Sequence, residues 1–392
     1  MMDLQEFRAA TRAWLEENCP QEMRQPMSEA DVCWGGRNWV FQSEAQKLWL
    51  DRMAARGWTV PTWPEAYGGA GLSGDEDRIL KEEMARISAR PPLQSFGIWM
   101  LGPALLEFGT EEQKRHFLPQ IARGEVRWCQ GYSEPGAGSD LAGLQTKGVE
   151  CGAHFEVTGQ KIWTSYADKA DWIFCLVRTE PEAPKHKGIS FLLFDMTSDG
   201  VSTKPIQLIS GASPFCETFF DGVKVPADQI VGERGKGWTI AKYLLTHERE
   251  MIGATDSALF GSEDIVDVSR EAIGVDADGR LADPVLRGQI GDFLADEIAF
   301  DAELARAKTW MRAGNQLGAQ SATLKYTGTE LNKRRQELIM AAGGLAALEW
   351  DFENAAGDEK ASLWLRSKGN SIEGGTSEVM LSILSKAILE LG

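Results

Sequence analysis

The stretch SIEGGTSEVML, residues 371–381, places an acid, two glycines and a pair of hydroxyls before an apolar helical run. Glu373 supplies a carboxylate that could move a proton, and Gly374 follows it in a pair of glycines. Thr376 stands where an apolar helical run begins, and helix N-termini favour phosphate. Two interpretations follow: either Glu373 is an acid–base residue, or the important feature is the glycine at 374.

A second carboxylate stands within LLTHEREMIGA, residues 244–254. The apolar residues of this stretch have helical spacing, and Glu248 and Arg249 lie beside His247. One interpretation is a solvated cluster of charges on a helix. The other is a base with a supporting cation, and this stretch by itself does not decide between them.

Two further stretches suit a flat ligand. In WCQGYSEPGAGSDLAGLQT, residues 128–146, Gly136 and Gly138 let a ligand approach the backbone, although such a turn is more often only a turn. In GQKIWTSYADKADW, residues 159–172, Trp163 precedes the hydroxyls of Thr164 and Ser165. An indole beside hydroxyls fits a conjugated ring, whereas the competing interpretation is a core tryptophan, since the chain contains 14.

Composition excludes several classes of protein. The net charge of −17 argues against duplex nucleic acid or an anionic membrane surface as partner. The six cysteines form no CxxC pair and the four histidines lie far apart, so we expect neither a metal site nor a disulfide framework. The lack of a disulfide framework suits a reducing compartment, so we expect a cytoplasmic location. No run of 18 apolar residues occurs, so we expect no membrane span.

The elements that must position these residues change along the chain. Residues 1 to about 122 have helical periodicity, with Thr110 as a predicted cap. Short β-branched and aromatic runs separated by Gly, Pro and Asp follow from about residue 127, and they indicate a small β-barrel or sandwich. The helical period then returns, and Ile290, Leu294, Ile298 and Leu304 are predicted to share one face of a bundle helix.

Taken together, the four stretches resemble the acyl-CoA dehydrogenase family. Further motifs in register are GWTVPTWPEAYGGAGLS (57–73), FGTEEQKRHFLPQIARGE (108–125) and VPADQIVGERGKGW (225–238), so the resemblance covers nearly the whole chain. It implies a mainly α protein with a central β-domain. The expected domains are an α-helical N-terminal domain (1–124), a β-barrel or sandwich (125–232) and a C-terminal four-helix bundle (233–392).

The resemblance also implies an enzyme of lipid catabolism that uses FAD to oxidise an acyl-CoA thioester to trans-2-enoyl-CoA. A carboxylate removes the α-proton, the β-hydride passes to flavin N5, and an electron-transfer flavoprotein takes the electrons. The residues that would contact FAD by this resemblance are Gln130, Tyr132, Ser133, Gly138, Ser139, Trp163, Thr164, Ser165, Gly343, Gly344, Thr376 and Glu378.

The position of the base separates subgroups of the family. Many members carry it immediately before GTS, and that position here is Gly374, so Glu373 falls one residue early. Another subgroup places a glutamate directly before an arginine on the first C-terminal helix, and Glu248-Arg249 matches it. The resemblance thus implies Glu248 as base, Arg249 in support and the Gly374 N–H as donor to the thioester oxygen. Substrate contacts would come from Ser139, Thr246, Arg249 and Gly375.

Two family features are absent from the sequence. Residues 269–289, SREAIGVDADGRLADPVLRGQ, lack an RxTFG-like segment, and Met340 stands where a glutamine is expected before Gly343 and Gly344. Both losses concern the adenosine half of the FAD site at a subunit interface. We therefore expect either a homodimer or homotetramer, or a heteromer with a related subunit. The alternative functions are a non-catalytic or partner-requiring subunit, and a flavoenzyme of the same fold acting as a desulfinase or oxidase.

Overall fold

The computed structural model describes the backbone of residues 3–254, 264–349 and 360–391, and it omits the side chains of residues 29, 246–254 and 312. Packing divides the chain into two units. The first contains Met1–Pro205 and Phe215–Leu244, and the second contains Ile206–Pro214 and Leu245–Gly392. The predicted boundaries at 124/125 and 232/233 stay a prediction, because they define three domains whereas this division gives two units.

The first unit begins with helices whose starts are encoded by capping residues. Ser73 and Thr110 each accept a hydrogen bond from the third helical residue in a capping box, as the sequence predicted for Thr110. A π-helical turn, Gly97–Leu101, precedes the fourth helix. The helices are α1 (Leu4–Asn18), α2 (Glu44–Ala55), α3 (Gly74–Arg86), α4 (Gly102–Phe108) and α5 (Glu111–Ala122).

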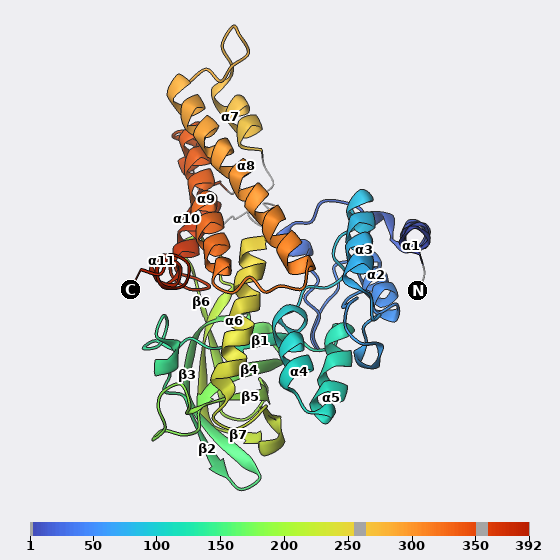
Figure 1. Cartoon of the computed structure of the whole chain (residues 1–392), viewed down its shortest axis with the longest axis vertical. Helices are drawn as coiled ribbons and strands as arrows, with labels where there is room; N and C mark the ends of the chain where they lie inside the picture. The colour runs from blue at the N-terminus through green and yellow to red at the C-terminus, as the bar shows by residue number, and fades with distance from the viewer. Residues whose placement is uncertain (1–2, 255–263, 350–359, 392) are drawn as a thin grey trace. The chain divides into compact units, whose positions relative to one another are not determined.

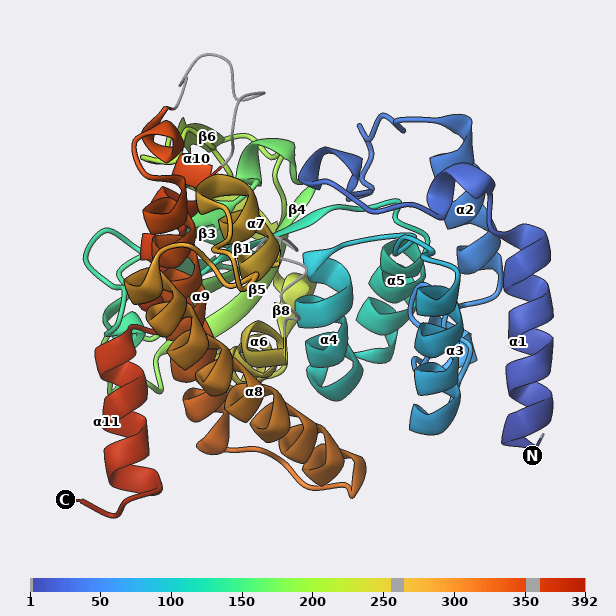
Figure 2. The same ribbon diagram turned by 90° about the horizontal axis from the view of Figure 1, so that it is seen from above.

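Helices α1 and α3 lie side by side, as Figure 2 shows. The buried carboxylate of Glu83 on α3 accepts hydrogen bonds from Arg8 and Arg12 on α1 and from Arg86 on its own helix. Hydrogen bonding from Arg12, followed by the other two guanidinium groups, lowers the pKa of Glu83 to about 2 despite its burial. This cluster fastens the two helices beside an apolar core that contains Leu15, Trp49 and Leu80.

The β region forms a single eight-stranded sheet with two well-paired parts. One part has the order β6-β7-β3-β2, and the other contains β1, β4, β5 and β8; they are joined where Lys147 of β2 pairs with Arg178 of β4. The strands are β1 (Trp128–Gly131), β2 (Lys147–Cys151), β3 (His154–Ser165), β4 (Trp172–Arg178), β5 (Ile189–Asp195), β6 (Val201–Ile206), β7 (Phe215–Pro226) and β8 (Ile230–Val231).

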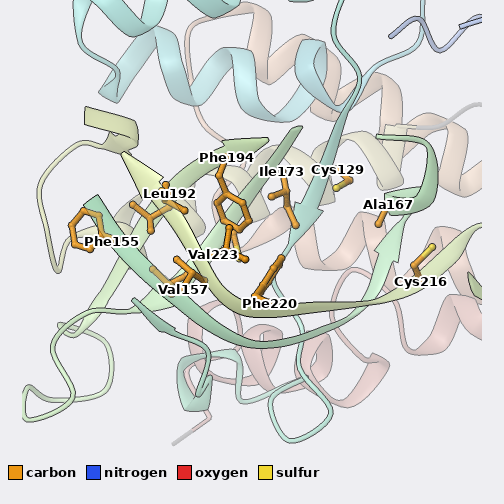
Figure 3. Close-up of a cluster of buried hydrophobic side chains, with 13 residues drawn as sticks. Cys129, Phe155, Val157, Ala167, Ile173, Leu192, Phe194, Cys216, Phe220 and Val223 are labelled. Carbon is orange, nitrogen blue, oxygen red and sulfur yellow. The ribbon is translucent and has the colours of Figure 1, made fainter. Parts of the chain in front are cut away.

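Alternating residues of both parts fill one core, which Figure 3 shows. Phe155 of β3 and Phe220 of β7 come from one part, whereas Ile173 of β4 and Phe194 of β5 come from the other. All four side chains are buried. Because period-2 alternation buries one face of each strand, two parts of a folded sheet pack with these faces together. The predicted central β-domain is thus confirmed.

The remaining helices belong mostly to the second unit, and α8 and α9 lie side by side in it (Figure 1). The helices are α6 (Gly237–Ala254), α7 (Ile265–Ile273), α8 (Pro284–Arg312), α9 (Gln320–Gly343), α10 (Lys360–Ser367) and α11 (Ser377–Ala387). The predicted order of helical, β and helical regions is confirmed. No helix in the described ranges is long and apolar enough to span a membrane.

The prediction that four apolar residues share one face of α8 is partly wrong. Ile290 and Leu304 are buried, and Leu294 packs against the core, but Ile298 is 70% exposed. A step of four residues advances 40° beyond a full turn of a 3.6-residue helix, so two such steps turn Ile298 about 80° from Ile290. Phe293, one step of three from Ile290, is fully buried instead.

Candidate functional site

The structure brings together two of the segments that the sequence singled out, both in the first unit. The amide of Ile162 on β3 donates to the carbonyl oxygen of Ser133 at 2.9 Å. This bond sets the end of β1 and the residues after it, from Gln130 to Ser133, beside the end of β3, from Trp163 to Ser165. Eight residues predicted to contact FAD lie on these two segments and the loop between β1 and β2.

Trp163 has an unusual backbone for a residue within a strand. Its φ is +60°, in the left-handed region that side chains other than glycine rarely adopt. The β3–β7 register shifts between Lys161 and Thr164, so Trp163 lies at a bulge that turns its side chain away from the core. The indole is 53% exposed, and the competing interpretation of a core tryptophan is therefore wrong.

Two polar side-chain atoms of these two segments are buried without a partner among the described residues. Within the described part of the chain, neither Thr164 Oγ1 nor Gln130 Nε2 has a hydrogen-bond partner. An unsatisfied buried donor or acceptor costs roughly 1–3 kcal/mol, and such atoms in native proteins need an explanation. A ligand with polar ring atoms that packs on the Trp163 indole could satisfy both.

The other predicted residues of this segment differ in exposure. The ring of Tyr132 is buried edge-on against Phe174 and Phe191, so its contact with a ligand would come from the backbone. Ser133 is half-buried. Gly138 and Ser139 are exposed after a turn, and a Cβ added to Gly138 would meet no atom within 4 Å. The loop therefore leaves open space where the sequence predicted close approach of a ligand.

A buried ion pair beneath these residues was not predicted. Lys161 Nζ lies 2.8 Å from Glu134 Oε1, and both side chains are buried. Burial opposes ionisation of Glu134, but the charge of Lys161 and hydrogen bonds from Lys161, Thr146 and Gln145 outweigh it and hold the pKa of the carboxyl below its usual range. In the sequence each residue resembled an ordinary surface charge, since no spacing links positions 134 and 161.

In the second unit, the turn that contains Glu373, Gly374 and Gly375, which we call the terminal turn, is bonded to α9 through the residue Asn370 that precedes it. Gly374 and Gly375 have φ of +63° and +101°, a pair of conformations that glycine adopts at low cost. Thr376 then caps α11 by accepting a hydrogen bond from Val379 N. Buried Lys325 of α9 donates to the carbonyl oxygen of Asn370 just before the turn.

The carboxylate of Glu373 is held by its neighbours. Arg366 Nη2 donates to it at 2.7 Å and Asn370 Nδ2 at 2.6 Å. These bonds engage the Glu373 carboxylate with a guanidinium and a side-chain amide of the same segment. This geometry favours the interpretation that the glycine at 374, and not Glu373, is the important feature of the turn.

The predicted adenosine-side residues also lie in the second unit. Gly343 ends α9, where a Cβ would come within 2.6 Å of Ala347 Cβ, and Gly344 follows with φ of +54°. Glu378 lies in the first turn of α11. A hydrogen bond from its own backbone amide, followed by one from the Thr376 hydroxyl, lowers the pKa of the Glu378 carboxyl.

Thr246, Glu248 and Arg249 lie on α6, as the helical spacing predicted. The structure describes the backbone but not the side chains of these three residues, so their assigned roles rest on the sequence.

Comparisons with known proteins agree along the whole chain. Three family models match: the N-terminal domain of acyl-CoA dehydrogenases at residues 2–125, the middle domain at 129–223 and the C-terminal domain at 235–389. A Mycobacterium tuberculosis protein named acyl-CoA dehydrogenase IpdE1 is 34% identical over 406 residues, which cover 100% of this chain and 98% of that protein.

Two solved structures also share its fold. One, named Tcur3481-Tcur3483 steroid ACAD, has a TM-score of 0.76 and 30% identity, with 100% of both chains covered. The other, the ChsE4-ChsE5 complex from Mycobacterium tuberculosis, has a TM-score of 0.74 and 30% identity, with 99% of this chain and 97% of that chain covered. The chain belongs to the acyl-CoA dehydrogenase family, and it is an oxidoreductase enzyme.

Proposed function

We propose that this enzyme oxidises an acyl-CoA thioester to trans-2-enoyl-CoA with FAD as cofactor. The observation that carries the proposal is made on the paired ends of β1 and β3: the indole of Trp163 is exposed, and Thr164 Oγ1 and Gln130 Nε2 are buried without a partner among the described residues. An isoalloxazine ring offers both an aromatic face and polar edge atoms, so its chemistry fits these groups. FAD bound there would supply the acceptor for the β-hydride.

The residues that would hold FAD follow from this fit. Trp163 would pack on the ring, and Gln130, Thr164 and Ser165 would bond its polar edge, with the backbone of Tyr132 and Ser133 alongside. Gly138 and Ser139 would line the path towards CoA. Glycines 343 and 344 and the N-terminal end of α11, with Thr376 and Glu378, would serve the phosphate and adenosine part, since helix N-termini favour anions.

Glu248 would be the base that removes the α-proton. Two observations in the terminal turn support this choice: position 374 carries no side chain, and Arg366 and Asn370 hold the neighbouring Glu373. Exclusion of water would raise the basicity of Glu248, and the N–H of Gly374 would stabilise negative charge on the thioester oxygen. Thr246, Arg249 and Gly375 would contact the substrate.

Thr164→Val should weaken FAD binding without lowering the thermal stability of the apoprotein. Valine has nearly the shape of threonine but lacks the hydroxyl, which has no partner among the described residues. One hydrogen bond contributes about 1 kcal/mol, so we expect the Kd for FAD to rise roughly fivefold. The thermal unfolding midpoint of the apoprotein should stay equal or rise. A lowered midpoint with an unchanged Kd would show that the hydroxyl serves the fold instead.

The relatives indicate the substrate class and the assembly. One similar structure is named a steroid ACAD, and two are named with pairs of chains. We propose that this chain acts on a ring-bearing acyl-CoA and pairs with a related subunit, which would supply the missing contacts to the adenosine half. Exposed apolar side chains of Leu345, Leu348 and Ile372, near Gly344 and Gly374 in sequence, support a partner in this region. An electron-transfer flavoprotein would accept the electrons.

The test is to purify the chain alone and together with a related subunit, and to measure FAD per chain and subunit composition. Anaerobic addition of steroid-derived and straight-chain acyl-CoAs should then reduce the flavin, with the steroid-derived thioesters reacting faster. A preparation without FAD under both conditions would contradict the proposal. Hydrogen peroxide formed at the rate of substrate oxidation would indicate an oxidase.

A further inference from the structure

A buried ion pair lies beneath the candidate flavin surface and takes no part in the proposed chemistry. The side chain of Lys161 is 0% exposed and that of Glu134 is 7% exposed. Burying two charges is costly, and replacing such a pair by apolar residues is often neutral or stabilising. A gain in stability is therefore a weak reason for this pair, and its geometry offers another.

Glu134 closes the loop that contains Gly138 and Ser139. Its Oε2 accepts from Gln145 N at 2.6 Å, and its Oε1 accepts from Thr146 N at 2.9 Å. One carboxylate at the start of the loop therefore binds two amides at its end. Residues 135–144, which we call the glycine loop, are thus held at their base by Glu134, while Arg178 donates to the carbonyl oxygens of Ala142 and Leu144 within the loop.

Lys161 links Glu134, and through it the base of the glycine loop, to the strand that contains Trp163. Its Nζ donates to Glu134 Oε1 and, at 3.1 Å, to the carbonyl oxygen of Tyr132. Its backbone pairs with Thr218 of β7, and the strained Trp163 follows two residues later. A tryptophan with positive φ persists only where the surrounding structure fixes it, and Lys161 is a fixed point on its N-terminal side.

We propose that Glu134 and Lys161 are positioning residues, whose ion pair holds the glycine loop and Trp163 in the FAD-binding arrangement before FAD binds. The inference rests on the proposed function, because it assigns the pair to the same FAD surface. A site that is already ordered loses less conformational entropy when its ligand binds, so loosening it weakens binding even where every contacting residue remains.

The test is the double variant Lys161→Met with Glu134→Gln, which removes both charges together and leaves no lone buried charge. Glutamine still offers one acceptor to the amides at the end of the loop. The control is Lys185→Gln, which breaks an exposed pair with Asp140 in the same loop. The Kd of each apoprotein for FAD, the visible spectrum of bound flavin and the thermal midpoint are measured.

We expect the Kd for FAD to rise about tenfold or more in the double variant, with an altered flavin spectrum. The control should change the Kd by less than about twofold, as for an exposed pair. A double variant that binds FAD like the wild type, whatever its thermal midpoint, would overturn the inference and leave the proposed function standing. Failure of the wild type to bind FAD in any assembly would contradict the proposed function itself.

If the double variant does not fold, hydrogen exchange of the wild-type apoprotein decides. The amides of Gln145 and Thr146 should exchange at least about tenfold more slowly than the amide of exposed Gly138, because Glu134 holds them before FAD is added. Equal rates at the three amides would overturn the inference.

Discussion

Glu248→Gln should keep FAD bound but slow the loss of oxidised-flavin absorbance on addition of acyl-CoA by about a thousandfold or more. Glutamine matches the size of glutamate and cannot accept the α-proton. Removal of that proton is required for oxidation, whereas FAD binding depends on other residues. The substitution should therefore lower the rate constant for flavin reduction and leave the flavin content unchanged.

Stopped-flow absorbance under anaerobic conditions measures this rate. The matched control is Glu373→Gln, whose carboxylate already bonds Arg366 and Asn370 and should lower the rate by no more than a few-fold. Undiminished reduction in the Glu248 variant would remove it as the base. A large loss in the Glu373 variant would transfer the role to the terminal turn.

Adding Gly374→Glu to the Glu248→Gln variant should restore part of the lost rate. Position 374 is where the family resemblance places the base of many members, and this chain has no side chain there to remove. The backbone at 374 has φ of +63°, and a residue with a Cβ in that conformation costs roughly 1–2 kcal/mol. We therefore expect partial recovery, about tenfold or more above the single variant.

The matched control is Gly374→Gln in the same background, which adds equal bulk without a base. Recovery with glutamate and none with glutamine would show that the substrate lies between the two positions. Equal rates for both, with FAD and acyl-CoA still bound, would contradict the idea that Gly374 vacates the site for a carboxylate on α6.

Local signals in the sequence predicted much of the fold. Thr110 is a cap because its hydroxyl accepts a hydrogen bond from Gln113 N, and the Gln113 side chain accepts one from Thr110 N. Both residues lie within one turn, so a short stretch of sequence is enough to predict the cap. The strands around Ile173 and Phe194 follow from buried β-branched and aromatic runs. Ile298 was predicted wrongly. The apolar spacing correctly indicates a helix, but each step of four residues rotates 40° around the helix axis, and the spacing alone does not say which residue of the series is no longer buried.

The sequence singles out candidate site residues, and their roles stay a prediction, but it does not give their geometry. Trp163 and Thr164 stand out as an indole beside a hydroxyl, yet the positive φ that exposes the indole depends on pairing with β7, far away in the sequence. Glu134 and Lys161 gave no signal, because an isolated acid and an isolated lysine usually lie on the surface. Only the fold brings these two charges into contact and buries them.

In the proposed site, the Glu248 carboxylate would face the α-carbon of a thioester bound against FAD. The most direct measurement is an experimental structure of the assembled enzyme with FAD and a non-oxidisable 3-thia-acyl-CoA. We expect a Glu248 oxygen about 3–3.5 Å from the α-carbon, with the thioester oxygen directed at the amide of Gly374. A Glu248 side chain directed into solvent, with another base beside the α-carbon, would contradict it.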